Sequence, residues 1–128
     1  MPISEDDVKK AMATWLKLRG FKNVKTRPGR TPGFDVEGVR SRSDKKLVVE
    51  CKGETNAPNQ WDRAWRNVSH GLFNAIKRTE DRANLYEVAV ALPDTENYRR
   101  RMEGLKTFCG RQSIAIYWVA KDGSVRRW

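Results

Sequence analysis

Apolar segments separated by helical patterns constrain the fold of this chain more than any other feature. Residues 46–52 (KLVVECK), 86–92 (YEVAVAL) and 113–120 (SIAIYWVA) have the length and apolar content of buried strands. The first has a centre that is apolar on both faces, which is typical of a strand inside a sheet. Helical patterns follow the first and the second of these strands, which is the order of βαβ units. We therefore expect an α/β domain with a mixed sheet and helices on both faces.

A helix and two further strands are predicted before this part of the chain. Residues 5–19 repeat apolar side chains at the spacing of one helical face, and Ser4 suits the N-terminal cap. Residues 21–26 are typical of a strand. Residues 34–39 alternate apolar and polar side chains, so they predict a half-buried strand that forms a hairpin with 46–52.

Two more helices, and an edge strand in the short tail after the turn at 121–124, complete the predicted order of elements. A helix that begins at Pro58–Asn59 carries an apolar stripe, which we assign to the core. That stripe comprises Trp61, Ala64, Trp65, Val68, Leu72, Ala75 and Ile76. A third helix follows a cap at Asp94 or Thr95. Its predicted inward side chains are Tyr98, Met102, Leu105 and Phe108.

The composition indicates a single basic domain, residues 1–128. Five Trp, four Phe and three Tyr supply enough apolar bulk for one core. Lysine and arginine number 26 against 16 acidic residues, and the resulting net charge of +10 favours a polyanion such as nucleic acid as the partner. The alternative is a basic surface that contacts only solvent and counterions.

The same sequence disfavours secreted and membrane settings. Two cysteines are too few for a disulfide framework, which favours a reducing compartment. No apolar run approaches the roughly 20 residues of a membrane helix. The first residues are acidic and lack the apolar stretch of a signal peptide. We therefore expect a cytoplasmic protein without a membrane partner.

Charged side chains end the first apolar strand. Glu50 and Lys52 stand two residues apart, so their side chains point to the same face of a strand. Asp35 begins the neighbouring hairpin strand, and the start of one antiparallel strand lies beside the end of the next. We therefore expect Asp35, Glu50 and Lys52 to converge. For Glu50 and Lys52 alone, the alternative is a salt bridge at a strand end.

Two carboxylates at one point suit a hard divalent cation. Asp35 and Glu50 with water ligands would bind Mg²⁺, with Mn²⁺ as a substitute, and the backbone carbonyl of Cys51 is a third candidate ligand. The chain has one histidine, so a zinc cluster is not indicated. A metal ion here would stabilise charge on a phosphodiester and lower the pKa of a bound water. Lys52 would orient that water or stabilise the pentacoordinate phosphate.

Asp35, a short hairpin and the run LVVECKG together resemble the PD-(D/E)xK nuclease superfamily, which includes restriction endonucleases, Holliday-junction resolvases and Mrr-like enzymes. The resemblance covers most of the chain, because the family core is a helix, a three-stranded meander with the Asp and the E-x-K, a helix and another strand. Phe34 stands where the motif has proline. The resemblance implies a restriction-endonuclease-like three-layer fold, with a central mixed β-sheet flanked by helices.

The resemblance also implies an activity, which is Mg²⁺-dependent endonucleolytic hydrolysis of phosphodiester bonds in DNA, with Asp35, Glu50 and Lys52 as the catalytic residues. Many members carry a further acid on the first helix, and Glu5 is the candidate ligand here, although the helix dipole also explains an acid in a first turn. Cutting two strands usually takes two active sites, which would favour a homodimer. The alternatives are a non-catalytic nucleic-acid-binding module on the same fold and an RNA-processing nuclease.

Arginines supply the predicted contacts to nucleic acid. Arg27 and Arg30 lie in the Pro/Gly loop before Asp35, where they would grip phosphates near the cut. Further basic side chains lie off the apolar stripe of the second helix, and these are Arg63, Arg66, Lys77 and Arg78. The alternative for each of them is an ordinary solvated charge.

Overall fold

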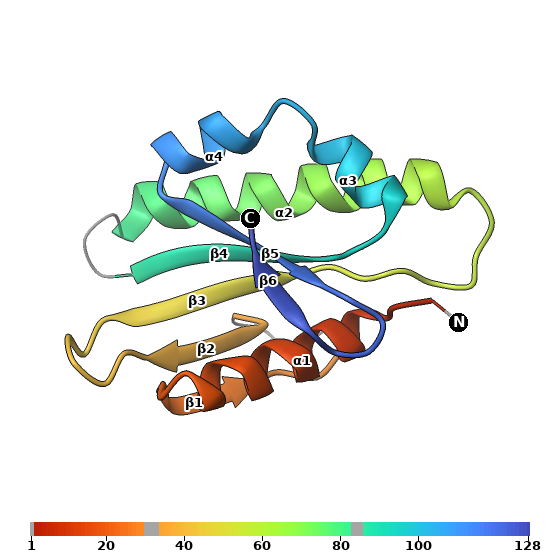
Figure 1. The fold of residues 1–128 in the computed structure, drawn as a ribbon. Helices are drawn as coiled ribbons and strands as arrows, with labels where there is room; N and C mark the ends of the chain where they lie inside the picture. The colour runs from red at the N-terminus through yellow and green to blue at the C-terminus, as the bar shows by residue number, and fades with distance from the viewer. Residues whose placement is uncertain (1, 30–33, 83–85) are drawn as a thin grey trace.

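The computed structural model describes residues 2–29, 34–82 and 86–128, which form a six-stranded sheet flanked by helices (Figure 1). The strands lie side by side in chain order as β1 (Lys22–Thr26), β2 (Val36–Val39), β3 (Lys46–Cys51), β4 (Tyr86–Pro93), β5 (Ile114–Val119) and β6 (Val125–Arg127). Strands β3, β4 and β5 run parallel to one another, and the other neighbouring pairs are antiparallel. The predicted α/β fold with a mixed sheet is confirmed.

Helices cover both faces of this sheet (Figure 1). One face carries α1 (Glu5–Leu18), and the other carries α2 (Gln60–Arg82), α3 (Glu96–Met102) and α4 (Lys106–Arg111). Side chains alternate along β3, so Leu47, Val49 and Cys51 join the core beneath α1. Val48 points the other way, into the core beneath α2 and α3. The free thiols of Cys51 and Cys109 therefore lie in different core layers.

The first helix begins where the sequence predicts. The Ser4 hydroxyl accepts a hydrogen bond from the Asp7 backbone N–H (3.0 Å), and the Asp7 carboxylate accepts one from the Ser4 N–H (3.0 Å). This capping box satisfies N–H groups that a helix start leaves without partners. The hydrogen bond from the Ser4 backbone is the main cause that lowers the pKa of Asp7. The start of α1, and with it Glu5, is thereby fixed.

The third predicted helix is in fact two helices. The chain turns after α3 at Gly104, whose φ of +81° suits a residue without a Cβ. Thr95 caps α3 as predicted, and its hydroxyl accepts the Tyr98 N–H. Tyr98 and Met102 are buried as predicted. The prediction for Phe108 is wrong, because the break at Gly104 changes the orientation of α4 and leaves Phe108 43% exposed.

Small side chains place α2 against the sheet. Ala64 and Ala75 are fully buried, and bulkier side chains of the helix are left on its flank. The side chains that we assigned to the core and that are exposed instead are Trp61 (42%), Trp65 (56%) and Ile76 (41%). The guanidinium of Arg101 lies 3.6 Å from the ring centroid of Trp61 and covers one face of that ring. No described helix, α2 included, is long and apolar enough to cross a membrane.

Candidate active site

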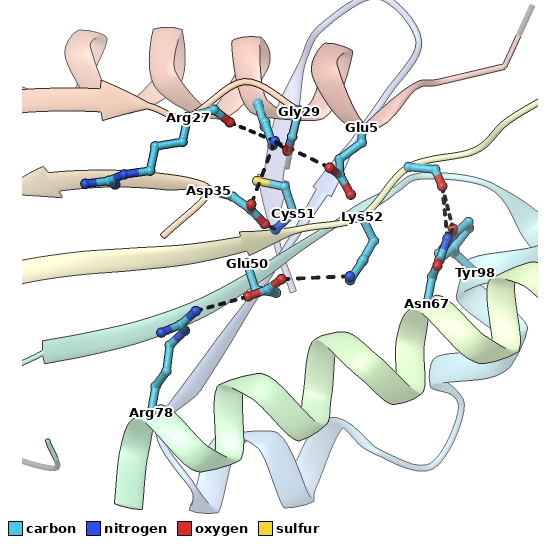
Figure 2. A network of polar contacts seen from close by, with 12 residues as sticks. Glu5, Arg27, Gly29, Asp35, Glu50, Cys51, Lys52, Asn67, Arg78 and Tyr98 are labelled. Atoms are coloured by element: carbon cyan, nitrogen blue, oxygen red, sulfur yellow. Dashed lines mark hydrogen bonds and ion pairs between the residues drawn. The ribbon is translucent and has the colours of Figure 1, made fainter. Parts of the chain in front are cut away.

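The predicted acids meet at the open end of the β2–β3 hairpin (Figure 2). The antiparallel register of these strands places Asp35 opposite Glu50. The Asp35 Oδ2 atom accepts the backbone N–H of Cys51 at 2.8 Å. The Nζ atom of Lys52 lies 3.8 Å from Glu50 Oε2. The predicted convergence of Asp35, Glu50 and Lys52 is therefore confirmed, whereas their catalytic and metal-binding roles stay predictions.

Burial makes the ionised carboxyl pair costly. The Glu50 side chain is 10% exposed and the Asp35 side chain 19%. Burial raises the pKa of Glu50, and the negative charge of Asp35 raises it further, while Lys52 and Arg78 oppose the rise. A proton on Glu50 can also be hydrogen-bonded to Asp35, and this raises the pKa of Glu50 in the same direction. This arrangement favours a positive species between the carboxyl groups, either a proton or a metal cation.

A buried lysine of α1 holds the other side of Asp35. Lys9 is 3% exposed, and its Nζ atom lies 3.7 Å from Asp35 Oδ1 and 3.4 Å from Glu5 Oε2. The same ammonium donates hydrogen bonds to the carbonyls of Arg27 (2.8 Å) and Gly29 (3.3 Å). Lys9 therefore joins the first helix, the segment after β1 and the acid pair.

Lys9 was not predicted as a site residue, although the sequence of α1 contains a signal for it. Lys9 precedes Met12, Ala13 and Leu16 by three, four and seven residues, so it lies on the buried stripe of α1. A lysine at a core position of a helix needs a buried acceptor. Because Glu5 lies one turn earlier, the spacing also predicts the Glu5–Lys9 pair.

A second cation approaches Glu50 from α2. The Arg78 Nη2 atom lies 3.6 Å from Glu50 Oε1, opposite the side that Lys52 contacts (Figure 2). The Arg78 guanidinium also stacks on Phe34, 4.4 Å from the ring centroid. The prediction for Arg78 was a contact to the nucleic-acid backbone or a solvated charge, since nothing in the linear pattern shows which strand end this helix crosses.

Formal charges balance within this cluster. The carboxylates of Glu5, Asp35 and Glu50 are matched by Lys9, Lys52 and Arg78. Among the described residues, no three His, Cys, Asp or Glu side chains come together as a preformed metal cage. The Glu5 carboxylate is 42% exposed and reaches Asp35 through Lys9, so its role as a metal ligand stays a prediction. The donor set that fits a metal is thus the Asp35–Glu50 pair, which suits Mg²⁺ because Mg²⁺ keeps several water ligands.

The end of β3 is packed tightly against the start of α1. A Cβ atom on Gly53 would lie 2.0 Å from the backbone nitrogen of Glu5, so only glycine fits there. The carbonyl of Gly53 accepts hydrogen bonds from Asn67 Nδ2 (3.1 Å) and the Tyr98 hydroxyl (3.0 Å). These contacts fix the backbone directly after Lys52 and bring Glu5 to the site.

A groove of about 510 Å³ lies between the start of α1, the segment after β3 and α2. Gly53 lies in its lining, so the groove adjoins Lys52. The wall that α2 provides consists of Arg63, Arg66, Asn67 and His70. Glu5 and Asp6 line the groove from the side of α1. The positive charge in this groove therefore comes from α2.

The other predicted phosphate contacts have different surroundings. The Arg27 Nη1 atom donates to the Phe34 carbonyl (3.0 Å) and lies 3.6 Å from Glu37 Oε2. Figure 2 shows the Arg27 side chain pointing away from Asp35. Its guanidinium is engaged within the protein, and a phosphate contact by Arg27 stays a prediction. Arg30 lies outside the described residues.

Comparisons of the chain with family models, with curated proteins and with solved structures give no match. The function of this site is therefore argued from its chemistry. Its main features are two partly buried carboxylates, a lysine beside them and a groove with a basic wall.

Proposed function

We propose that this protein is a Mg²⁺-dependent endodeoxyribonuclease with a restriction-endonuclease-like fold and a PD-(D/E)xK site. One observation carries the proposal: Asp35 and Glu50 lie partly buried at adjacent strand ends, with Lys52 Nζ 3.8 Å from Glu50. Acids and bases balance in number here, yet burial and then the charge of Asp35 raise the pKa of Glu50, so the ionised pair is costly for the fold. An arrangement that is costly for the fold is typical of a functional site.

The residues present fit a hard divalent cation. Asp35 and Glu50 would hold Mg²⁺, or Mn²⁺ in its place, with the Cys51 carbonyl as a further candidate ligand. The ion would lower the pKa of a coordinated water and neutralise charge on the phosphate. Asp35 is already oriented by the Cys51 N–H, so little rearrangement is needed to present its carboxylate.

Lys52 is the group that would act on the reacting atoms. Its ammonium would orient the attacking water and stabilise negative charge on the pentacoordinate phosphate. The water oxygen forms a new bond to phosphorus and releases a proton to solvent. The bridging P–O bond on the opposite side breaks, and the leaving oxygen takes a proton from solvent. The Lys52 Cγ atom lies 3.6 Å from the position that a Cβ atom would take on Gly71 of α2, so the lysine stem packs over this glycine. This contact limits the directions in which the ammonium can point.

The groove supplies a place for the DNA backbone. Arg63 and Arg66 line it on the α2 side, next to the segment that follows Lys52. Their charges would hold phosphates independently of base sequence. The net charge of +10 supports the same partner. A homodimer would supply the second active site that duplex cleavage usually takes.

The experiment is a cleavage assay on supercoiled plasmid, linear duplex and branched DNA, and RNA, with Mg²⁺, Mn²⁺ or EDTA. We expect nicking or cutting of DNA with either metal and none with EDTA. Lys52→Met should abolish cleavage, whereas Arg42→Ala, at an exposed arginine in the β2–β3 turn, should cleave like the parent. Cleavage by Lys52→Met at the parental rate, or DNA binding by the parent without any cleavage, would refute the proposal.

A further inference from the structure

Arg78 of α2 contacts both an acid of the site and an aromatic ring. Its guanidinium lies 4.4 Å from the Phe34 ring centroid on one side and 3.6 Å from Glu50 Oε1 on the other. Its side chain is 29% exposed, so it is open to solvent while it contacts the site (Figure 2). Glu50 thus has a cation at each oxygen, since Lys52 Nζ lies 3.8 Å from Oε2.

Within residues 2–29, 34–82 and 86–128, the Arg78 guanidinium donates no hydrogen bond. Stacking on Phe34 uses the face of the guanidinium, and the 3.6 Å approach to Glu50 exceeds hydrogen-bond length. By contrast, Arg27 donates to the Phe34 carbonyl at 3.0 Å, and Arg99 donates to Asp94 at 2.6 Å. A guanidinium held by an aromatic face, with free N–H groups, is suited to bidentate binding of a phosphate.

Arg78 also stands where a metal ion on Glu50 would repel it. Mg²⁺ binds oxygen ligands at about 2.0–2.1 Å, much closer than the 3.6 Å that separates Arg78 from Glu50. Lys9 and Lys52 already supply positive charge around the acid pair. Metal binding would therefore weaken the Arg78–Glu50 contact and leave the stacking on Phe34 as the anchor of the guanidinium.

We propose that Arg78 is an additional catalytic residue, which pairs with Glu50 until a metal ion binds and then grips the scissile phosphate. This inference rests on the proposed nuclease function. Before metal loading, Arg78 neutralises Glu50. After loading, Phe34 keeps the guanidinium beside the site, and its N–H groups donate to non-bridging phosphate oxygens.

Metal binding tests, without any cleavage, whether Arg78 competes with a metal ion for Glu50. Mn²⁺ is titrated into the free protein by calorimetry for the parent, Arg78→Met, Arg78→Lys and Arg42→Met. We expect Arg78→Met to bind Mn²⁺ several-fold more tightly than the parent, because a competing cation is gone, and the other two to stay close to the parent. Parental or weaker binding by Arg78→Met overturns the inference. A parent that binds no Mn²⁺ overturns both this inference and the proposed function.

DNA binding and cleavage test whether Arg78 binds the scissile phosphate once a metal ion is present. In EDTA, a short duplex should bind the parent and Arg78→Lys equally, since without a metal ion Glu50 pairs with the charged side chain at position 78. With Ca²⁺, the affinity of the parent for the duplex should increase. The affinity of Arg78→Lys should be about tenfold lower than that of the parent, which corresponds to the loss of one hydrogen bond to a charged group. With saturating Mg²⁺, Arg78→Lys should cleave roughly 10²-fold more slowly, since lysine cannot bind bidentately.

A role confined to neutralising Glu50 makes the opposite prediction for Arg78→Lys. Lysine keeps the positive charge, so parental Ca²⁺-dependent binding and parental cleavage by this variant would overturn the inference. Thermal unfolding shows whether each variant is folded. If Arg78→Met is destabilised, Arg78→Lys still tests the inference, because lysine keeps the positive charge. If the parent cleaves nothing, the proposed function fails, and the Mn²⁺ and Ca²⁺ measurements still decide whether Arg78 responds to a metal on Glu50.

Discussion

The Asp35 carboxylate accepts the backbone N–H of Cys51 at 2.8 Å, on the strand that carries Glu50 and Lys52. This hydrogen bond joins the start of β2 to the end of β3. The other oxygen of Asp35 lies 3.7 Å from Lys9 Nζ. Both oxygens of Asp35 are therefore oriented by groups within the chain, and the carboxylate is preorganised for a ligand.

Asp35→Asn should separate activity from folding. The amide oxygen can still accept the Cys51 N–H, and Lys9 keeps Glu5 and two backbone carbonyls as partners. We therefore expect a change in unfolding free energy below about 1 kcal/mol. DNA cleavage should fall to the background level, because a neutral amide binds Mg²⁺ poorly. Asp35→Ala should lose about 1–3 kcal/mol of stability as well, since the hydrogen-bond acceptor is removed. Thermal unfolding and plasmid cleavage measure both effects, and an active Asp35→Asn variant would contradict the assignment.

Glu50→Gln should stabilise the protein at neutral pH while abolishing metal binding. Burial, followed by the charge of Asp35, raises the pKa of Glu50 above its ordinary value. The folded state therefore binds this proton more tightly than the unfolded state does, and the parent loses stability as pH rises through the raised pKa. Glutamine cannot ionise and escapes that loss.

The pH dependence of this difference provides the check. Below the ordinary glutamate pKa of about 4.3, Glu50 is protonated in both states, so parent and Glu50→Gln should unfold at nearly the same temperature. At pH 7 the variant should have the higher Tm. Glu103→Gln is the control, because Glu103 is exposed and its replacement should shift Tm little at either pH. A parent that is more stable than Glu50→Gln at pH 7 would contradict the prediction.

Lys9→Met should be among the most damaging substitutions in α1. It leaves the carbonyls of Arg27 and Gly29 without their donor and removes the partner of Asp35. Breaking a buried ion pair costs about 3–5 kcal/mol. Lys10→Met, at an exposed position of the same helix, should change stability by less than about 0.5 kcal/mol. Denaturant unfolding compares the two, and equal effects would mean that the Lys9 contacts contribute little.

Gly53→Ala should destabilise the fold by about 3 kcal/mol or more, because the added Cβ would lie 2.0 Å from the Glu5 nitrogen and the backbone has to move. Gly110→Ala is the matched control. It lies in α4, with no atom within 4 Å of an added Cβ, so alanine should be neutral or stabilise by up to about 1 kcal/mol. A Gly53→Ala protein with parental Tm would show that the contact between the end of β3 and α1 can relax.

Period-two alternation predicted which residues would meet at the hairpin end, but not which helices would reach them. Asp35, Glu50 and Lys52 could be placed together because strand pairing fixes their neighbours. Arg78 could not, since its contact with Glu50 depends on how α2 crosses the sheet. Trp61 and Trp65 fit the apolar stripe by spacing, yet α2 packs through Ala64 and Ala75 and leaves both rings exposed. Such packing depends on side-chain volume, which a binary pattern of apolar and polar residues does not record.

The basic wall of the groove predicts how DNA affinity depends on salt. If Arg63 and Arg66 each neutralise one phosphate, replacing either by alanine should reduce the slope of log K against log salt by about 0.9. Binding should weaken alike for unrelated duplex sequences, because phosphate contacts carry no base information. Fluorescence anisotropy across a salt series gives the slope, with EDTA present to prevent cleavage. Arg42→Ala, in the β2–β3 turn, should leave the slope unchanged. An unchanged slope for Arg63→Ala and Arg66→Ala would place the DNA path elsewhere on the protein, and the groove would then have no part in binding.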